Sequence, residues 1–201
     1  MAAYGYDWKL QSNDKADAMT YKQAIGNAKK YESKVYFDNH TYNLHYQYIS
    51  EDDDSLHEVH FTDAATNFNT VRFATESKLA GTVLWRLGGE DNRLWDFYDQ
   101  AMTKAGLSDF NFEHFARLDA GIEPVYTGEG EILDIVASPK PGKLKLELDD
   151  NAILISEESY DTLPSTYIIN KFGATKKRKL VLTFDDGRSE EHTSELQSPM
   201  F

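Results

Sequence analysis

Two adjacent carboxylates, Asp185 and Asp186, follow the apolar run LVLTF and precede a glycine. A buried strand that ends in this way delivers both side chains to the catalytic mouth of a β/α barrel. Adjacent strand residues point to opposite sides, so one carboxylate could act as a general base and the other as a metal ligand. The alternative is a hairpin turn, for which Asp-Gly is a favoured pair. A hairpin turn should be followed by a second strand. Only RSEEHTSE follows here, so the hairpin alternative is weakened but not removed.

Two aromatic segments have the residue types to bind a sugar. In YGYDW, residues 4–8, Asp7 stands among aromatic residues such as Tyr6. The rings would stack on the apolar face of a sugar, and the carboxylate would accept hydrogen bonds from its hydroxyls. The alternative is the edge of an aromatic core with a capping aspartate. Trp85, in TVLWRL, could form the floor of a ligand pocket or simply fill the core.

Six histidines and an acidic run raise the question of a bound metal. His57 and His60 are three residues apart, whereas the zinc-binding helix motif HExxH needs four. On a strand these two side chains face opposite sides and cannot share an ion. His40 and His45 lie in a loop-like stretch without paired carboxylates at a useful spacing. The acidic run Asp52-Asp53-Asp54 could suggest calcium, but it lacks the glycine and distal glutamate of an EF-hand loop, so we expect a solvated loop there.

Composition limits the classes of protein to which these residues can belong. The chain has 201 residues, and 40% of them are hydrophobic, which is enough for a packed core. The formal net charge of −13 argues against a nucleic-acid partner, because such proteins carry a basic patch or stripe. Cysteine is absent, which excludes disulfides and thiolate chemistry. No apolar run reaches the ~18 residues of a membrane-spanning helix, and no signal peptide is visible.

The first part of the chain alternates between helix-like and strand-like segments. Apolar spacing predicts helices over residues 16–31, 64–80 and 92–105. Short aromatic or β-branched runs predict strands over residues 35–37, 42–49, 57–61 and 82–87. Asp14 or Asp17 could cap the first helix, and Asp63 precedes the second. The two strands on either side of EDDDS suggest a hairpin with this acidic segment at its tip. Alternation of strands and helices with short connectors is typical of parallel βα units.

Beyond residue 106 the pattern changes to short strand-like runs separated by prolines and glycines. These runs are residues 131–136, 143–148, 152–155 and 166–170. KLKLEL alternates strictly, which indicates a half-exposed antiparallel strand. We therefore expect a small β-rich module here, followed by a strand over residues 180–184.

The order YGYDW, VYFDNHTYNLHYQY, HEVHFTDA and GTVLWRLGGED resembles the C-terminal part of a family 18 glycoside hydrolase, a chitinase-like barrel. The resemblance covers roughly residues 1–105. In that family a Tyr-Asp pair closes the sixth strand and a tryptophan of the last strand lines the sugar subsite, which implies substrate-binding roles for Tyr6, Asp7 and Trp85. The family signature DxxDxDxE, which carries the catalytic glutamate, is absent from this sequence.

The segment KKRKLVLTFDDG is similar to the opening motif of NodB-like polysaccharide deacetylases, carbohydrate esterase family 4. The resemblance implies that Asp185 is the catalytic base and that Asp186 is a ligand of a divalent metal, expected to be zinc. The later HxxxH-type motif that supplies the metal histidines is absent, and Arg188 replaces the usual proline. The final segment, RSEEHTSELQSPMF, looks like a translated sequencing adapter. We interpret residues 188–201 as a non-native tail.

These expectations combine into one hypothesis about a fragment of a longer protein. The fold is α/β: the C-terminal part of a TIM (β/α)8 barrel over residues 1–106, a β-rich connector over 107–177, and the first strand of a second β/α barrel over 178–187. The parent protein would hydrolyse and deacetylate a polysaccharide that contains N-acetylglucosamine. The chain itself would be inactive, without a bound cofactor or membrane segment. The resemblance implies the extracellular space or cell envelope of a bacterium.

Two alternatives to this hypothesis stay open. A degenerate family 18 barrel can become a non-catalytic, lectin-like carbohydrate binder, which would keep the aromatic wall and lose the catalytic acid. The short motifs could also occur by chance in a small α/β domain of unrelated function.

Overall fold

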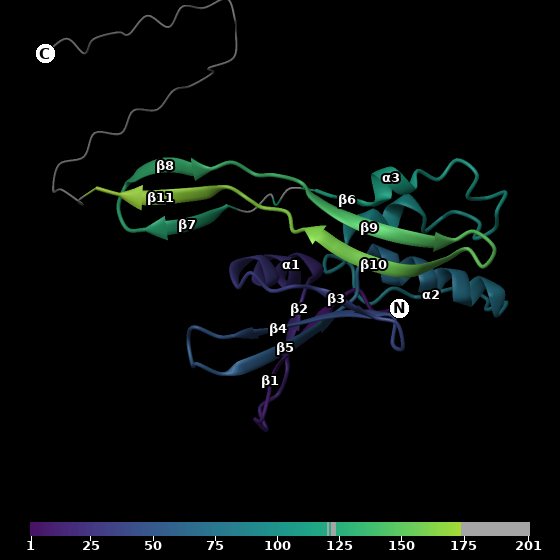
Figure 1. The fold of residues 1–201 in the computed structure, drawn as a ribbon, viewed down its shortest axis with the longest axis horizontal. Helices are drawn as coiled ribbons and strands as arrows, with labels where there is room; N and C mark the ends of the chain where they lie inside the picture. Colours follow the sequence, from purple (N-terminus) through teal and green to yellow (C-terminus); the bar gives the residue numbers. More distant parts are fainter. Residues whose placement is uncertain (120, 122–123, 174–201) are drawn as a thin grey trace, which may run out of the picture.

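The computed structural model describes residues 1–119, 121 and 124–173 of the chain (Figure 1). Over these residues the fold is mixed α/β, with three small sheets and few helices. Asp185, Asp186, the strand expected over residues 180–184 and the tail from residue 188 lie outside the described residues. Within the described part of the chain, no helix is long and apolar enough to cross a membrane.

The first sheet contains five strands in the order β2-β1-β5-β4-β3. Their bounds are β1 Gly5–Lys9, β2 Asp17–Met19, β3 Tyr36–Asp38, β4 Asn43–Ile49 and β5 Leu56–Phe61. The expected hairpin is confirmed, because β4 pairs with β5 and Tyr46 lies opposite Val59. The expectation of parallel βα units is wrong for these strands, since every pairing in the sheet is antiparallel. Short loops can join antiparallel neighbours, whereas parallel neighbours need a long crossover.

Helix α1 (Tyr21–Lys30) covers one face of this sheet, which we call the inner face (Figure 1). The face opposite to it is the outer face. Between the helix and the inner face lies an apolar core that contains Ala24, Ile25, Ala28, Leu44, Tyr46, Val59 and Phe61. Burial of this apolar surface is the main force that holds the helix on the sheet.

The first helix begins five residues later than the sequence predicts. Residues 17–19 pair with β1 as strand β2, so they are not available to the helix. Thr20 is the N-cap, in place of Asp14 or Asp17. Its hydroxyl accepts from the Gln23 amide at 3.2 Å, and the Gln23 side chain accepts from the Thr20 amide at 2.8 Å, which completes a capping box.

Helix α2 (Ala64–Glu76) begins where the sequence predicts. Asp63 is its N-cap, and the Asp63 carboxylate accepts from the Thr66 amide at 2.9 Å. The helix ends at Glu76 instead of residue 80 because Lys78 adopts a left-handed φ of 53°. The amide of Leu79 then donates back to the Ala74 carbonyl at 3.0 Å, as in a Schellman cap.

The segment 82–87 does not form the expected strand. Trp85 instead makes an isolated parallel bridge with Ala2. The Ala3 amide donates to the Trp85 carbonyl at 2.8 Å, and the Trp85 amide donates to the Met1 carbonyl at 2.9 Å. Residues 1–3 and 83–85 therefore run side by side in the same direction.

The helix expected over residues 92–105 is also wrong. Only the 3-10 helix η1 (Asn92–Asp96) forms, and the short helix α3 (Phe112–Phe115) follows. Phe97, Met102 and Leu107 are buried in one core with Phe68 of α2. Their five-residue spacing does not fit one face of a helix, so the chain buries them through a series of turns.

The expectation of a β-rich region after residue 106 is confirmed. One sheet has the order β10-β9-β6 and the other has the order β7-β11-β8. The bounds are β6 Arg117–Leu118, β7 Val125–Gly128, β8 Ile132–Ala137, β9 Gly142–Asp149, β10 Leu154–Thr162 and β11 Ile168–Phe172. Strand β11 pairs in parallel with β7 and antiparallel with β8.

The hairpin β9–β10 packs against α2 and contributes to the same core. The Asn69 side-chain amide donates to the Ile155 carbonyl at 2.8 Å, and the Ile155 amide donates to the Asn69 side-chain oxygen at 2.9 Å. Ile155 is buried in the core that contains Phe68. Part of the β-rich region is therefore integrated with the N-terminal half of the described chain.

Candidate functional site

The structure separates the three residues that the sequence suggests for sugar binding. Tyr6 and Asp7 are neighbours in β1 and therefore point to opposite faces of the sheet. Tyr6 lies on the outer face and is 37% exposed. The Asp7 side chain lies on the inner face and is 13% exposed. Trp85, which could have filled the core, is 68% exposed and is bridged to Ala2 near the start of β1.

A row of ring-bearing side chains crosses the outer face of the five-stranded sheet. The register places His60 of β5 opposite Tyr6, His45 of β4 opposite His60, and Tyr36 of β3 opposite His45. The His45 and His60 rings are stacked at a centroid distance of 5.4 Å, and the Tyr36 and His45 centroids are 5.8 Å apart. His45 therefore lies in β4, which confirms the strand predicted over residues 42–49 and shows that the expectation of a loop-like stretch around His45 is wrong. We call Tyr6, His60, His45 and Tyr36 the outer-face row.

Trp8 extends this aromatic surface along β1. Its ring centroid lies 5.5 Å from that of Tyr6 and 5.5 Å from that of His60. The Tyr4 ring contacts Tyr6 from the other direction, at 5.4 Å. The segment YGYDW thus supplies aromatic rings to the outer face and directs Asp7 away from them.

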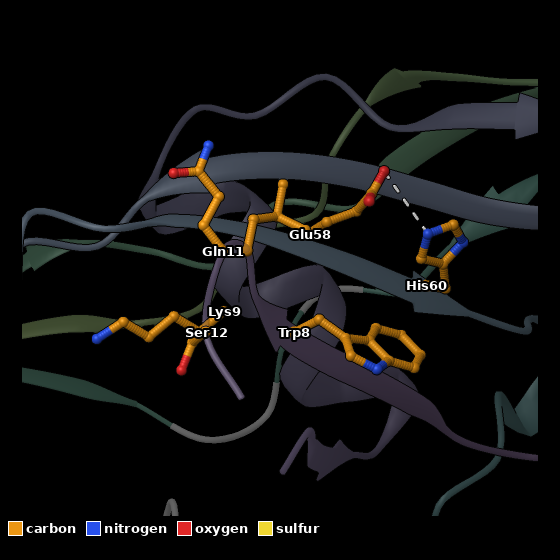
Figure 2. A pocket seen from close by; sticks show the side chains of 7 residues that line it. Trp8, Lys9, Gln11, Ser12, Glu58 and His60 are labelled. Carbon is orange, nitrogen blue, oxygen red and sulfur yellow. Dashed lines mark ion pairs between the residues drawn. The ribbon is translucent and has the colours of Figure 1, made fainter. Parts of the chain in front are cut away.

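An open hollow of about 540 Å³ lies beside Trp8 (Figure 2). Glu58 and His60 face it from β5, and the end of β1 with the turn that follows lines the rest. The Glu58 carboxylate lies 3.6 Å from His60 Nε2 and 3.8 Å from His45 Nδ1. It also accepts a hydrogen bond from the Gln47 side chain at 3.3 Å. The hollow therefore has the Trp8 ring on one side and the Glu58 carboxylate on another, and Gln47 and His60 hold that carboxylate in position.

On the inner face, Asp7 belongs to a hydrogen-bonded network. The Tyr48 hydroxyl donates to one Asp7 oxygen, and the other oxygen lies 2.9 Å from His57 Nδ1. Burial, together with the hydrogen bond to Asp7, raises the pKa of Tyr48. His57 Nε2 in turn lies 2.9 Å from the Ser55 hydroxyl oxygen. His57 and His60 lie on opposite faces, as their spacing predicts.

Ser55, His57 and Asp7 have the spatial order of a Ser-His-Asp triad. The Ser55 hydroxyl, however, donates to Asp53, and Lys9 Nζ lies 2.8 Å from the same carboxylate. A nucleophilic serine must donate its hydroxyl hydrogen to the histidine, and here that hydrogen is donated to the Asp53 carboxylate. The arrangement therefore ties the exposed acidic loop of residues 51–54 to β1 and does not activate a nucleophile.

A separate charged cluster is buried where α2, η1 and β10 meet. Arg93 Nε lies 3.1 Å from both Asp91 carboxylate oxygens, and Arg93 Nη2 lies 3.3 Å from Asp63. The Tyr160 hydroxyl donates to Asp63 at 2.7 Å. Neither oxygen of the buried Glu158 carboxyl has a hydrogen-bond partner among the described residues. Burial and the charge of Asp63 raise the pKa of Glu158 well above its usual value.

This buried cluster is structural, and the sequence alone did not reveal it. Asp91 follows a glycine-rich turn and looks like a surface charge, although it pairs with the buried Arg93 two residues later. In the described ranges, no group of three or more histidine, aspartate and glutamate side chains is arranged to bind a metal ion. The residues of the expected deacetylase site, Asp185 and Asp186, lie outside those ranges.

The chain is similar in sequence to two curated bacterial proteins, and no protein-family model matches it. It is 31% identical over 88 residues to the cortical fragment-lytic enzyme of Bacillus cereus, and 30% identical over the same length to that of Bacillus anthracis. Each match covers 42% of this chain and 20% of the relative. The chain thus spans about a fifth of the length of the curated relatives it matches.

Solved structures of the same kind also align with part of the chain. The spore cortex-lytic enzyme SleL of Bacillus cereus aligns with a TM-score of 0.43 and 29% identity, over 45% of this chain and 22% of SleL. A chitinase from Chromobacterium violaceum aligns with a TM-score of 0.44 and 28% identity, over 47% of this chain and 29% of the chitinase. The proteins to which this chain is similar are thus named as lytic enzymes and a chitinase.

Proposed function

We propose that this chain is part of a carbohydrate-active hydrolase that acts on a polysaccharide containing N-acetylglucosamine. The 31% identity to a cortical fragment-lytic enzyme over 88 residues supports this reading. The observation that carries it is the exposed ring of Trp85, whose backbone is bridged to Ala2 in the segment that leads into Tyr6. Two exposed aromatic rings on neighbouring segments suit the apolar faces of sugar rings.

The parallel bridge between Ala2 and Trp85 also supports the proposal that the first 106 residues come from a barrel. Residues 1–3 and 83–85 run parallel, and α2 lies between them in the chain. A strand, a helix and a parallel strand form the repeating unit of a (β/α)8 barrel. In this proposal β1 would continue the first of these strands, and the other strands of the antiparallel sheet would be inserted in the chain before helix α2. In this view residues 1–106 are the C-terminal part of a barrel of the family 18 type.

The proposed substrate-binding residues contribute in different ways. Tyr6 and Trp85 would each offer an exposed ring on which a sugar can stack. The two oxygens of Asp7 already interact with Tyr48 and His57. A sugar hydroxyl would have to replace one of these partners to bind Asp7 directly. Without that replacement, Asp7 would act by holding β1 and the neighbouring hairpin in position.

The chain by itself is proposed to bind glycan without cleaving it, because the printed sequence lacks the DxxDxDxE signature. The β-rich connector over residues 107–177 and the start of a NodB-like deacetylase over 178–187 are proposals that rest on the sequence. In that deacetylase, Asp185 would be the base and Asp186 a ligand of a divalent metal such as zinc. The parent protein would work outside the cell or in the envelope of a bacterium.

A binding and hydrolysis experiment on the full chain tests this proposal. Isothermal titration calorimetry with chitohexaose should detect binding, and Trp85→Ala should weaken it about tenfold, the factor that corresponds to 1.4 kcal/mol. Chromatography of the same mixture should show intact chitohexaose. If neither chitohexaose nor a muropeptide glycan binds, the proposal is wrong. Appearance of shorter oligosaccharides would contradict the claim that the chain binds without cleaving.

A further inference from the structure

Strand β10 packs against helix α2 and is attached to it at two points (Figure 1). At the first point, Ile155 exchanges two hydrogen bonds with the Asn69 side chain, at 2.8 and 2.9 Å. Further along β10, Glu158 and Tyr160 are two residues apart and therefore point to the same side of the strand. The Tyr160 hydroxyl donates to Asp63, the N-cap of α2, at 2.7 Å. The second attachment thus lies at the buried start of the helix.

The Glu158 carboxyl is the member of this second attachment whose hydrogen bonding is unexplained. It is 4% exposed, and neither of its oxygens accepts a hydrogen bond from a described residue. The Asp63 carboxyl lies within hydrogen-bonding reach of it. Two ionised carboxylates have only acceptor oxygens and repel each other, whereas a protonated carboxyl has an O–H group that can donate. One proton between the two groups would satisfy Glu158 and remove the repulsion.

The surroundings of the two carboxyl groups assign this proton to Glu158. Asp63 accepts from the Thr66 amide at 2.9 Å and from Tyr160, and Arg93 Nη2 lies 3.3 Å from it. Burial opposes the ionisation of Asp63, but the contact with Glu158 and the charge of Arg93 outweigh it and lower the pKa of Asp63. Burial and the charge of Asp63 have the opposite effect on Glu158, whose pKa they raise. Asp63 is therefore the ionised partner and Glu158 the protonated one.

The charges of the whole cluster agree with this assignment. Asp91 and Arg93, at the start of η1, also face Glu158. Three buried carboxyl groups thus share one guanidinium, so full ionisation would leave two negative charges uncompensated in the interior. Tyr21 of α1 and Tyr160 complete the cluster. Burial raises the pKa of both tyrosines above the usual value of about 10, so neither changes its charge between pH 6 and 8.

We propose that Glu158 retains a proton, which it donates to Asp63, and that this shared proton is a pH-sensitive latch that holds β10 on helix α2. When β10 leaves the helix, Glu158 enters water, where the pKa of a glutamate is about 4.3, and its proton passes to the solvent. Above that pH each opening of the latch releases one proton, so the opened fraction rises tenfold per pH unit until Glu158 also ionises in the docked form. The latch goes beyond the proposed function, because docking of the β9–β10 hairpin requires no glycan.

Amide hydrogen exchange of the full chain, followed by NMR at pH 6, 7 and 8, tests the latch. The Ile155 amide is the reporter, because its acceptor is Asn69 on α2 and the bond breaks when β10 separates from the helix. Exchange is measured where its rate is proportional to the opened fraction and is corrected for the intrinsic effect of pH. Glu158→Gln keeps a donor for Asp63 and removes the titrating group. Glu147→Gln makes the same change at a 50% exposed side chain on β9.

We expect the protection of the Ile155 amide to fall tenfold per pH unit in the unmodified chain and in Glu147→Gln, and to be independent of pH in Glu158→Gln. Infrared spectroscopy at pH 7 should also show a protonated carboxyl band that Glu158→Gln lacks. Protection that does not change with pH in the unmodified chain would overturn the latch, and so would an equal fall in Glu158→Gln. Absence of the protonated carboxyl band from the unmodified chain would overturn the shared proton. If Glu158→Gln does not fold, the pH dependence and the infrared band of the unmodified chain decide the question.

Discussion

Replacement of Arg93 with methionine should destabilise the chain by about 3–5 kcal/mol, the range measured when one partner of a buried ion pair is removed. Arg93 is 8% exposed, and its guanidinium interacts with Asp91 and Asp63 and donates to the Phe115 carbonyl at 2.7 Å. Methionine keeps much of the apolar stem and removes the charge. Asp63 and Asp91 would then remain buried without the cation that compensates them, which accounts for most of the expected loss.

The natural control is Arg72→Met on helix α2. Arg72 makes an i,i+4 ion pair with Glu76 at 2.7 Å on the helix surface. Such exposed helical pairs contribute about 0.3–0.5 kcal/mol. The Arg93 side chain is 8% exposed and the Arg72 side chain is 20% exposed, and Arg72 pairs with an exposed Glu76. The same change of side chain is thus made at a buried ion cluster and at an ion pair that water reaches, so the two variants compare these two settings.

The assay is urea unfolding of the full chain, followed by far-UV circular dichroism and by tryptophan fluorescence. Coincident transitions from the two probes would justify a two-state fit and linear extrapolation to water. The reasoning would be refuted if Arg93→Met and Arg72→Met reduced the free energy of unfolding by the same amount. A double variant that also carries Asp91→Asn should recover part of the loss, because it removes one of the uncompensated charges.

Two further predictions concern the buried interior. Burial raises the pKa of the Glu158 carboxyl in the folded state. The contribution of this carboxyl to the free energy of unfolding is therefore fully present below its pKa in the unfolded chain, about 4.3, and is lost as the pH rises through its pKa in the folded chain. Glu158→Gln should therefore unfold at a higher urea concentration than the unmodified chain at pH 9, with a smaller advantage at pH 4; an equal advantage at both pH values would contradict this. Phe68→Ala should cost about 3–5 kcal/mol, because Phe68 is fully buried among aromatic rings. Phe73→Ala, on the same helix and 62% exposed, should stay within about 0.5 kcal/mol in the same urea titration, and similar losses from the two variants would show that the aromatic core is misplaced.

Features that depend on neighbouring residues could be predicted from the sequence. The hairpin β4–β5 follows from two alternating runs on either side of an acidic tip, and both halves of that signal are local. Asp63 could be identified as a cap because an N-cap acts on amides only two or three residues away. The opposite orientation of His57 and His60 likewise follows from the two-residue period of a strand.

Features that depend on distant partners could not be predicted in this way. Residues 17–19 have helical spacing, but pairing with β1 makes them a strand. The spacing of residues 92–105 predicts a helix, yet the core around Phe68 buries side chains at a five-residue spacing. In both cases, contacts with residues far away in the chain outweigh a propensity worth a few tenths of a kcal/mol per residue.

The candidate site shows the same division. The sequence by itself determined that aromatic residues concentrate in YGYDW and that Trp85 is available to a ligand if it is exposed. Only the tertiary structure decided that Tyr6 and Asp7 serve different faces and that His60, His45 and Tyr36 continue the row. The register between strands, set by burial of the inner face against α1, determines which side chains become neighbours on the outer face.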